Sequence, residues 1–179
     1  MKLIRKILPV VLMIWPYLFV AYFLLAGGES KALPPAVERN FVPVYCLLTA
    51  VVYGLNIWNA LTWPQEDAGK ALTFYDMTVK LVHIPFYIFV FLCGVALLFS
   101  MVVPALLFIS PFLILCLVVV DFFLMLTSSM YGISAALRMS QKNILSKNAA
   151  TLFIVLHLLF VADVFGAVGL FAKRKGERS

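Results

Sequence analysis

The chain has 179 residues, of which 64% are hydrophobic and 12% are charged, and its formal net charge is +6. An ordinary soluble domain has roughly a quarter charged residues, so this composition excludes that class and predicts an integral membrane protein. Lys and Arg stand almost entirely at the ends of apolar runs, where they orient a chain in a membrane. We therefore expect the lipid bilayer, and no nucleic acid, as a partner, and a multi-pass location in the cell membrane.

Five apolar stretches reach the length of about 20 residues that a helix needs to cross a bilayer. The longest stretch between them, residues 127–150, is shorter than the ~50 residues of a small soluble domain. We therefore predict an all-α fold, a polytopic transmembrane helical bundle of about five spans that forms a single domain over residues 1–179. The predicted spans cover residues 7–26, 41–63, 79–103, 105–126 and 151–172.

The first apolar stretch follows three basic residues, as the core of a signal peptide does. Its length of about 20 residues exceeds the ~7 to 15 of a signal peptide, so we interpret it as a retained span. Cleavage after Ala26 is the alternative.

The third and fourth stretches are separated only by "SMVVPALLFISPF". A single helix through both would be about 72 Å long, which no bilayer accommodates, so we predict a tight hairpin centred on Pro104. Beyond the fourth span the helix should continue, because "TSSMYGISAALRM" contains no helix breaker except Gly132. Small residues recur on one face there and again in the last span, which predicts close helix packing or reflects only the usual abundance of small residues in membrane helices. They are Ser128, Gly132, Ala136, Ala162 and Gly166.

Five spans would place the two basic tails on opposite sides of the membrane. The side of the amino terminus then has eight Lys and Arg and the other side has six, which leaves the orientation open.

Most polar residues inside the apolar stretches fall within about 10 Å of one predicted membrane boundary. This candidate intramembrane polar cluster consists of Asn56, Asn59, Lys80, His83, Asp121 and His157, together with the deeper Asp163. Asp121 can pair with Lys80 or His83 across the predicted hairpin, or Lys80 can extend to the headgroups while Asp121 meets water. Asp163 lies twelve residues into its span, roughly 18 Å deep, and must be protonated, paired or facing a wet cavity.

The sequence contains no recognised motif for metal binding, cofactor binding or catalysis. The His and Asp residues come from different predicted helices without a local ligand spacing, so we expect no metal and no cofactor. Neither G-x-S-x-G nor His-Glu-x-x-His nor a Gly-rich phosphate loop occurs, and we expect no enzyme. Cys46, Cys93 and Cys116 each stand alone in a different span, which predicts apolar packing residues without a disulfide.

Three segments carry a resemblance to a known group: "KLVHIPFYIFVF", "SSMYGISAALRMSQKN" and "FVADVFGAV" with the basic tail that follows it. Over roughly the last hundred residues the chain resembles small uncharacterised multi-pass membrane proteins of Gram-positive, clostridia-like bacteria. The resemblance implies no activity. It implies that the group's recurring positions are Lys80, His83, Pro85, Ser129, Tyr131, Gly132 and Asp163.

Two classes of function agree with these observations. Packing faces favour a non-enzymatic membrane partner or accessory subunit, which associates with another membrane protein or with itself. The polar layer and the deep Asp163 favour a small permease or ion-coupled transporter, since intramembrane acids commonly mark ion or proton paths. A lipid-processing enzyme ranks third.

Overall fold

The computed structural model describes residues 2–26, 34–64, 68–159 and 162–176. Within these ranges all regular structure is helical, as predicted, and six helices are present. The chain divides into two compact units, residues 1–63 and 64–179. The single domain over the whole chain stays a prediction.

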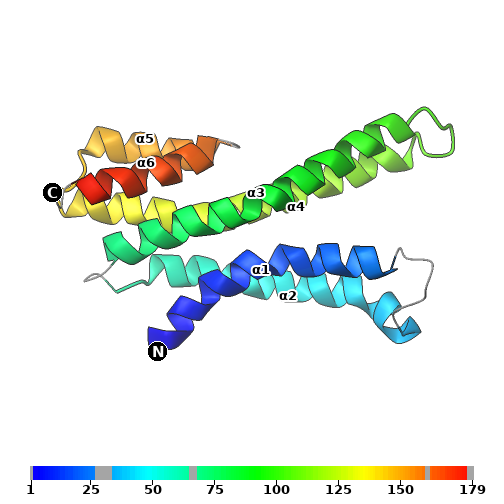
Figure 1. The fold of residues 1–179 in the computed structure, drawn as a ribbon, viewed down its shortest axis with the longest axis horizontal. Coiled ribbons are helices and arrows are strands. Elements are labelled where there is room, and N and C mark those ends of the chain that lie inside the picture. Colours follow the sequence, from blue (N-terminus) through cyan, green and yellow to red (C-terminus); the bar gives the residue numbers. More distant parts are fainter. Residues whose placement is uncertain (1, 27–33, 65–67, 160–161, 177–179) are drawn as a thin grey trace. The chain divides into compact units, whose positions relative to one another are not determined.

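The first unit is a pair of antiparallel helices, α1 (Lys2–Ala26) and α2 (Pro35–Leu61) (Figure 1). Proline suits the first position of α2, because its fixed φ matches a helix and its missing N–H has no partner to lose there. Stacked aromatic rings join the two helices. The Trp15 and Tyr45 centroids lie 5.3 Å apart, and those of Tyr22 and Phe41 lie 3.8 Å apart.

Hydrogen bonds fix the register of α1 against α2. The Trp15 indole donates to the Thr49 hydroxyl over 2.8 Å, and the Tyr45 hydroxyl donates to the Trp15 carbonyl over 3.0 Å. At the other end of the pair, Asn59 donates to the Arg5 carbonyl over 3.0 Å. Aromatic stacking and mostly neutral hydrogen bonds therefore hold this unit together, and one charged hydrogen bond joins the Arg5 guanidinium to the Thr62 carbonyl.

The second unit is built on two long antiparallel helices, α3 (Ala68–Ser100) and α4 (Ile109–Gln141). Each has 33 residues and is therefore about 50 Å long. Residues 101–108, which include Pro104, form the turn between them, and the Ser100 and Ser110 hydroxyls meet across it at 2.7 Å. Helix α3 begins eleven residues before the predicted span 79–103, and this difference brings Asp76 into the helix.

Two short helices, α5 (Lys147–His157) and α6 (Ala162–Gly176), pack beside the end of the α3–α4 pair that is remote from the turn at 101–108 (Figure 1). Ser146 caps α5 by accepting a hydrogen bond from the Ala149 amide over 3.3 Å. The prediction of one fifth span over 151–172 is not confirmed, because this stretch falls on two helices. Helices of 11 and 15 residues are about 17 and 23 Å long, too short to cross a hydrocarbon core of about 30 Å.

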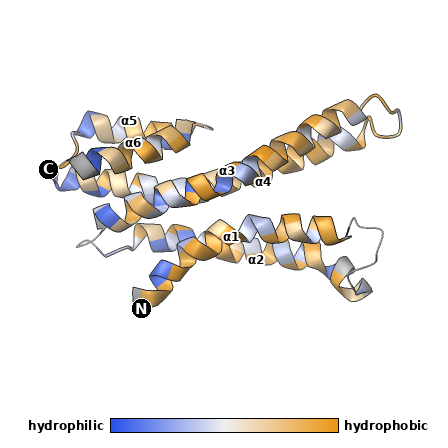
Figure 2. Cartoon of the chain, viewed as in Figure 1, coloured by the Kyte–Doolittle hydropathy of each residue, from blue (hydrophilic) through white to orange (hydrophobic). Residues whose placement is uncertain are grey.

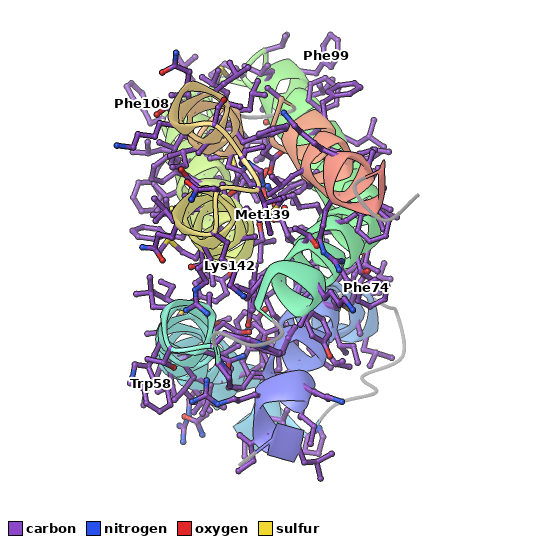
Figure 3. All side chains as sticks on the ribbon, turned by 90° about the vertical axis from the view of Figure 1, so that its left-hand side faces the viewer. Trp58, Phe74, Phe99, Phe108, Met139 and Lys142 are labelled. Carbon is purple, nitrogen blue, oxygen red and sulfur yellow. The ribbon has the colours of Figure 1, made fainter. Side chains whose placement is uncertain are left out.

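Four helices, α1 to α4, are long and apolar enough to cross a membrane. Hydrophobic residues dominate them, most completely in the part of the α3–α4 pair near the turn at 101–108 (Figure 2). Large apolar side chains point outward from these helices and from the turn between α3 and α4, among them Trp58, Phe99 and Phe108 (Figure 3). Cys46 and Cys116 also lie on outer helix surfaces, so the prediction that the cysteines fill packed positions is wrong for these two.

Candidate functional site

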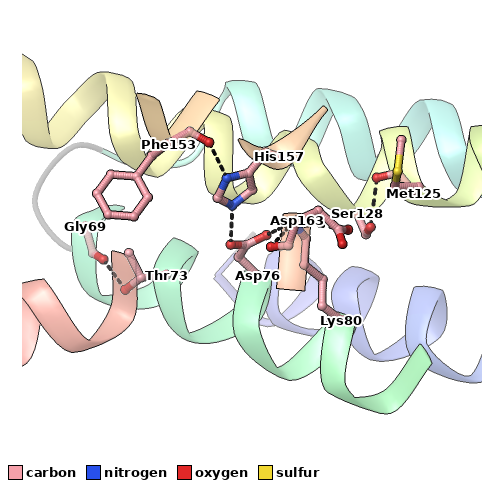
Figure 4. A network of polar contacts seen from close by, with 9 residues as sticks. All are labelled: Gly69, Thr73, Asp76, Lys80, Met125, Ser128, Phe153, His157 and Asp163. Atoms are coloured by element: carbon pink, nitrogen blue, oxygen red, sulfur yellow. Dashed lines mark hydrogen bonds and ion pairs between the residues drawn. The ribbon is translucent and has the colours of Figure 1, made fainter. Parts of the chain in front are cut away.

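Four ionisable side chains form a buried network where α3 meets α5 and α6 (Figure 4). Asp76 and Lys80 come from α3, His157 ends α5 and Asp163 stands in the first turn of α6. Their exposed fractions are 0%, 0%, 0% and 2%. Burial of this kind is rare for charged groups unless they are paired.

Lys80 lies between the two acids of the network. Its Nζ is 3.4 Å from Asp76 Oδ1 and 3.5 Å from Asp163 Oδ2, and it donates a hydrogen bond to the Asp163 carbonyl over 3.2 Å. Asp76 precedes Lys80 by four residues, so both stand on one face of α3. Of the three possibilities predicted for Asp163, the structure shows pairing.

His157 connects Asp76 to α5, and its partners define its protonation. Nδ1 lies 2.6 Å from the Phe153 carbonyl oxygen, which only accepts, so Nδ1 carries a proton. Nε2 lies 2.8 Å from Asp76 Oδ2, and this contact is a hydrogen bond only if one of the two atoms carries a further proton. One proton therefore lies in the hydrogen bond between the two side chains.

Gly132 of α4 gives His157 room to reach Asp76. A Cβ at this position would lie 1.9 Å from His157 Nε2 and 2.6 Å from Asp76 Oδ2. Any side chain on Gly132 would therefore displace the hydrogen bond itself. Gly166 of α6 serves the same imidazole from the other side, since its Cβ would lie 3.1 Å from His157 Nδ1.

The other small residues of the predicted packing faces surround this crossing. Ser128 and Ala136, one turn to either side of Gly132, are fully buried, and the Ser128 hydroxyl donates to the Met125 carbonyl over 2.9 Å. Ala162 is half-buried at the start of α6. Ser129 and Tyr131, two positions that the resemblance singled out, are also fully buried.

The break between α5 and α6 allows both His157 and Asp163 to face α3. In one continuous helix, residues six apart differ by about 240° around the axis and by about 9 Å along it. They could not then reach Asp76 and Lys80, which stand on a single face. The run "LHLLFVAD" contains no Gly or Pro, so tertiary contacts, not a local breaker, favour the interruption.

The predicted Lys80–Asp121 pair is wrong. Gly132 lies level with Asp76, so Lys80, four residues further along α3, lies level with Ser128 of the antiparallel helix. Asp121 is then about seven residues, or ~10 Å, beyond Lys80 along the bundle. It lines a groove with Tyr87 instead.

The remaining members of the predicted cluster are distributed over both units. His83 is fully buried on α3, and its ring meets that of Tyr87 edge-on at 6.1 Å. Asn56 and Asn59 belong to the first unit. The Asn59 amide donates across to α1, whereas the Asn56 amide donates to the Val52 carbonyl within its own helix over 2.8 Å.

Sequence reasoning missed Asp76, because "PQEDAGKALTFYD" reads as a polar connection. A signal was present. An acid four residues before Lys80, with His83 three residues further on, places three ionisable groups on one helical face. Among the described residues, no group of three or more His, Cys, Asp or Glu side chains is arranged to hold a metal ion.

The helices and the network define an all-helical chain whose four long apolar helices are compatible with a membrane protein. A family model described as "Family of unknown function (DUF6652)" matches residues 8–176. The chain belongs to this family. Comparison with curated proteins and with solved structures gives no match.

Proposed function

We propose that the chain is an integral membrane protein with four spans, α1 to α4, and a re-entrant hairpin formed by α5 and α6. Apolar side chains on the outer faces of the two short helices support this arrangement, because Leu152, Val155 and Phe165 are all exposed. A helix break at membrane depth is tolerated where protein satisfies its polar groups, and His157 and Asp163 beside this break are buried and paired.

The distribution of basic residues supports the same topology. Four spans and a re-entrant hairpin put both tails and the α2–α3 and α4–α5 connections on one side, which the positive-inside rule makes cytoplasmic. Lys31 and Arg39 are then the two basic residues on the opposite side, and Lys80 is in the network. The other eleven stand on the proposed cytoplasmic side: Lys2, Arg5, Lys6, Lys70, Arg138, Lys142, Lys147, Lys173, Arg174, Lys175 and Arg178.

We further propose that the second unit is a small permease that couples transport to protons. The observation that carries this proposal is the buried network, because it joins His157, Asp76, Lys80 and Asp163 through one hydrogen bond and two ion pairs. Intramembrane ionisable groups of this kind mark ion and proton pathways by default. Helices interrupted at membrane depth also characterise the binding sites of secondary transporters.

The test is proton uptake into vesicles that contain the purified full chain and a pH-sensitive dye, driven by an imposed negative potential. The wild type should acidify the lumen faster than empty vesicles, and Asp163→Asn should abolish the difference, because the amide cannot ionise. Glu38→Gln makes the same chemical change in α2 and should leave uptake unchanged. Wild-type uptake no faster than in empty vesicles, or full uptake by Asp163→Asn, would contradict the proposal.

A second candidate function is that of a non-enzymatic membrane partner that associates with another copy of itself through α2. The exposed outer surface of this helix favours this function, because only 6% of the residues in its most apolar 18-residue stretch are buried. A variant that keeps Cys46 as its sole cysteine should then form disulfide-linked dimers when membranes are oxidised, because Cys46 is exposed on α2. A variant with Cys116 alone is the matched control on α4, and equal cross-linking of both would reject a specific α2 contact.

A further inference from the structure

A groove of about 490 Å³ runs between α3 and α4, toward the turn at 101–108 from the charge network. Its size is typical of sites for small molecules. Its walls are almost wholly apolar, and Leu158, the residue after His157, contributes to its boundary. An occupant of the groove would therefore contact the break between α5 and α6.

Asp121 is the only charged residue among those that line the groove. Its Oδ1 is buried and accepts no hydrogen bond from any described residue. A buried carboxylate oxygen that lacks a donor is energetically costly and attracts positive charge. Tyr87, Phe91 and Phe122 line the same groove, and aromatic faces also attract cations.

Gly94 leaves open space in the wall of the groove. A Cβ built on this residue meets no atom within 4 Å, although Gly94 lies inside a helix and lines the groove. A larger side chain there would fill the groove without removing a charge or displacing backbone. The position therefore separates the effect of space from the effect of charge.

We propose that this groove binds a lipophilic organic cation, whose apolar body occupies the space beside Gly94 and whose positive charge faces Asp121. An anion would face a carboxylate, and an uncharged lipid chain would leave Asp121 without a counter-charge. As the substrate class of the permease, this assignment rests on the proposed function. Leu158 follows His157 and borders the groove, so proton movement in the network would be coupled to release of the cation through the position of this residue.

The test is equilibrium binding of tetraphenylphosphonium to the purified full chain in detergent, with triphenylphosphine oxide as an uncharged probe. The wild type should bind the cation saturably and at least about tenfold more tightly than the uncharged probe, because the attraction acts in a medium of low dielectric constant. Asp121→Asn should remove this preference. Gly94→Leu should abolish binding of both probes, whereas Gly54→Leu, the same change at an open glycine of α2, should bind normally.

Equal affinity for the two probes in the wild type, or an unchanged preference in Asp121→Asn, would overturn the assignment and leave a groove for lipid chains. Normal binding by Gly94→Leu would overturn its location. Failure of this proposal is distinguishable from failure of the proposed function. Proton uptake without cation binding contradicts only the ligand assignment, and cation binding without proton uptake contradicts only proton coupling.

Discussion

The two units of the chain are both helical and apolar outside, yet different interactions hold their helices together. In the first unit, α1 and α2 meet through stacked rings and neutral hydrogen bonds such as that between Trp15 and Thr49. In the second, α3, α4, α5 and α6 enclose two acids, a lysine and a histidine. Aromatic packing needs no further explanation than stability.

Buried charge does need one, because apolar residues of the same volume often hold helices together at least as well. The charge network also constrains the residues around it, because it requires a glycine at residue 132 and a helix break after His157. The first unit imposes no comparable demand at Gly54, where a Cβ would meet no atom within 4 Å. The difference supports the proposal that the second unit carries the functional site and that the first supplies further membrane-spanning surface.

The largest expected effect comes from filling the space at Gly132. Gly132→Leu should destabilise the second unit by about 4 kcal/mol or more, because its side chain would occupy the place of the His157–Asp76 hydrogen bond. Gly94→Leu, the same change on α3, should cost less than about 1 kcal/mol, since it extends into open space. Thermal unfolding in detergent and protease cleavage within residues 142–176 measure the two effects. Equal stability of the two variants would mean that α5 and α6 do not dock at Gly132.

Neutralising the lysine of the network should have the next largest effect. Lys80→Met leaves Asp163 buried without a cation and leaves Asp76 with His157 as its remaining partner, and we expect a loss of about 3 to 5 kcal/mol. Adding Asp163→Asn should recover part of this loss, because the uncompensated charge is then gone. The free energies of unfolding of the two single variants and the double variant give the coupling.

Asp121 provides the control for this cycle. Lys80→Met and Asp121→Asn should be additive within about 0.5 kcal/mol, because the two residues lie at different levels of the bundle. If Lys80→Met were additive with Asp163→Asn but coupled to Asp121→Asn, the partner of Lys80 would be Asp121 and not Asp163.

Hydropathy and the length of the apolar stretches were sufficient to predict an all-helical fold and the four long apolar helices α1 to α4. They could not predict the interruption of the last run, because Leu158 and Leu159 are as apolar as their neighbours and contain no local stop signal. The break depends on partners on α3 that are about eighty residues away in sequence. Such a tertiary contact leaves no trace in local periodicity.

The candidate site shows the same limit in a different form. Lys80, His157 and Asp163 were recognisable, because each ionisable group interrupts an otherwise apolar run. Which groups pair depends on the register of the antiparallel helices α3 and α4, which brings Ser128 instead of Asp121 level with Lys80, and on the docking of α6, which supplies Asp163 as the partner. Asp76 was not predicted as a member of the site, because the predicted span begins at residue 79 whereas the helix begins at Ala68.

The smallest expected effect tests the neutral contacts of the first unit. Thr49→Val removes the acceptor of the Trp15 indole but keeps the shape of the side chain and the Trp15–Tyr45 stack. Hydrogen bonds between membrane helices contribute around 0.6 kcal/mol, so the unfolding temperature should fall by only about 1 to 2 °C. Thr62→Val is the matched control, because the Thr62 hydroxyl, like that of Thr49, donates to the carbonyl four residues earlier. A drop for Thr49→Val as large as that for Lys80→Met would mean that neutral contacts carry as much of the stability as the charge network does, and the contrast between the two units would then disappear.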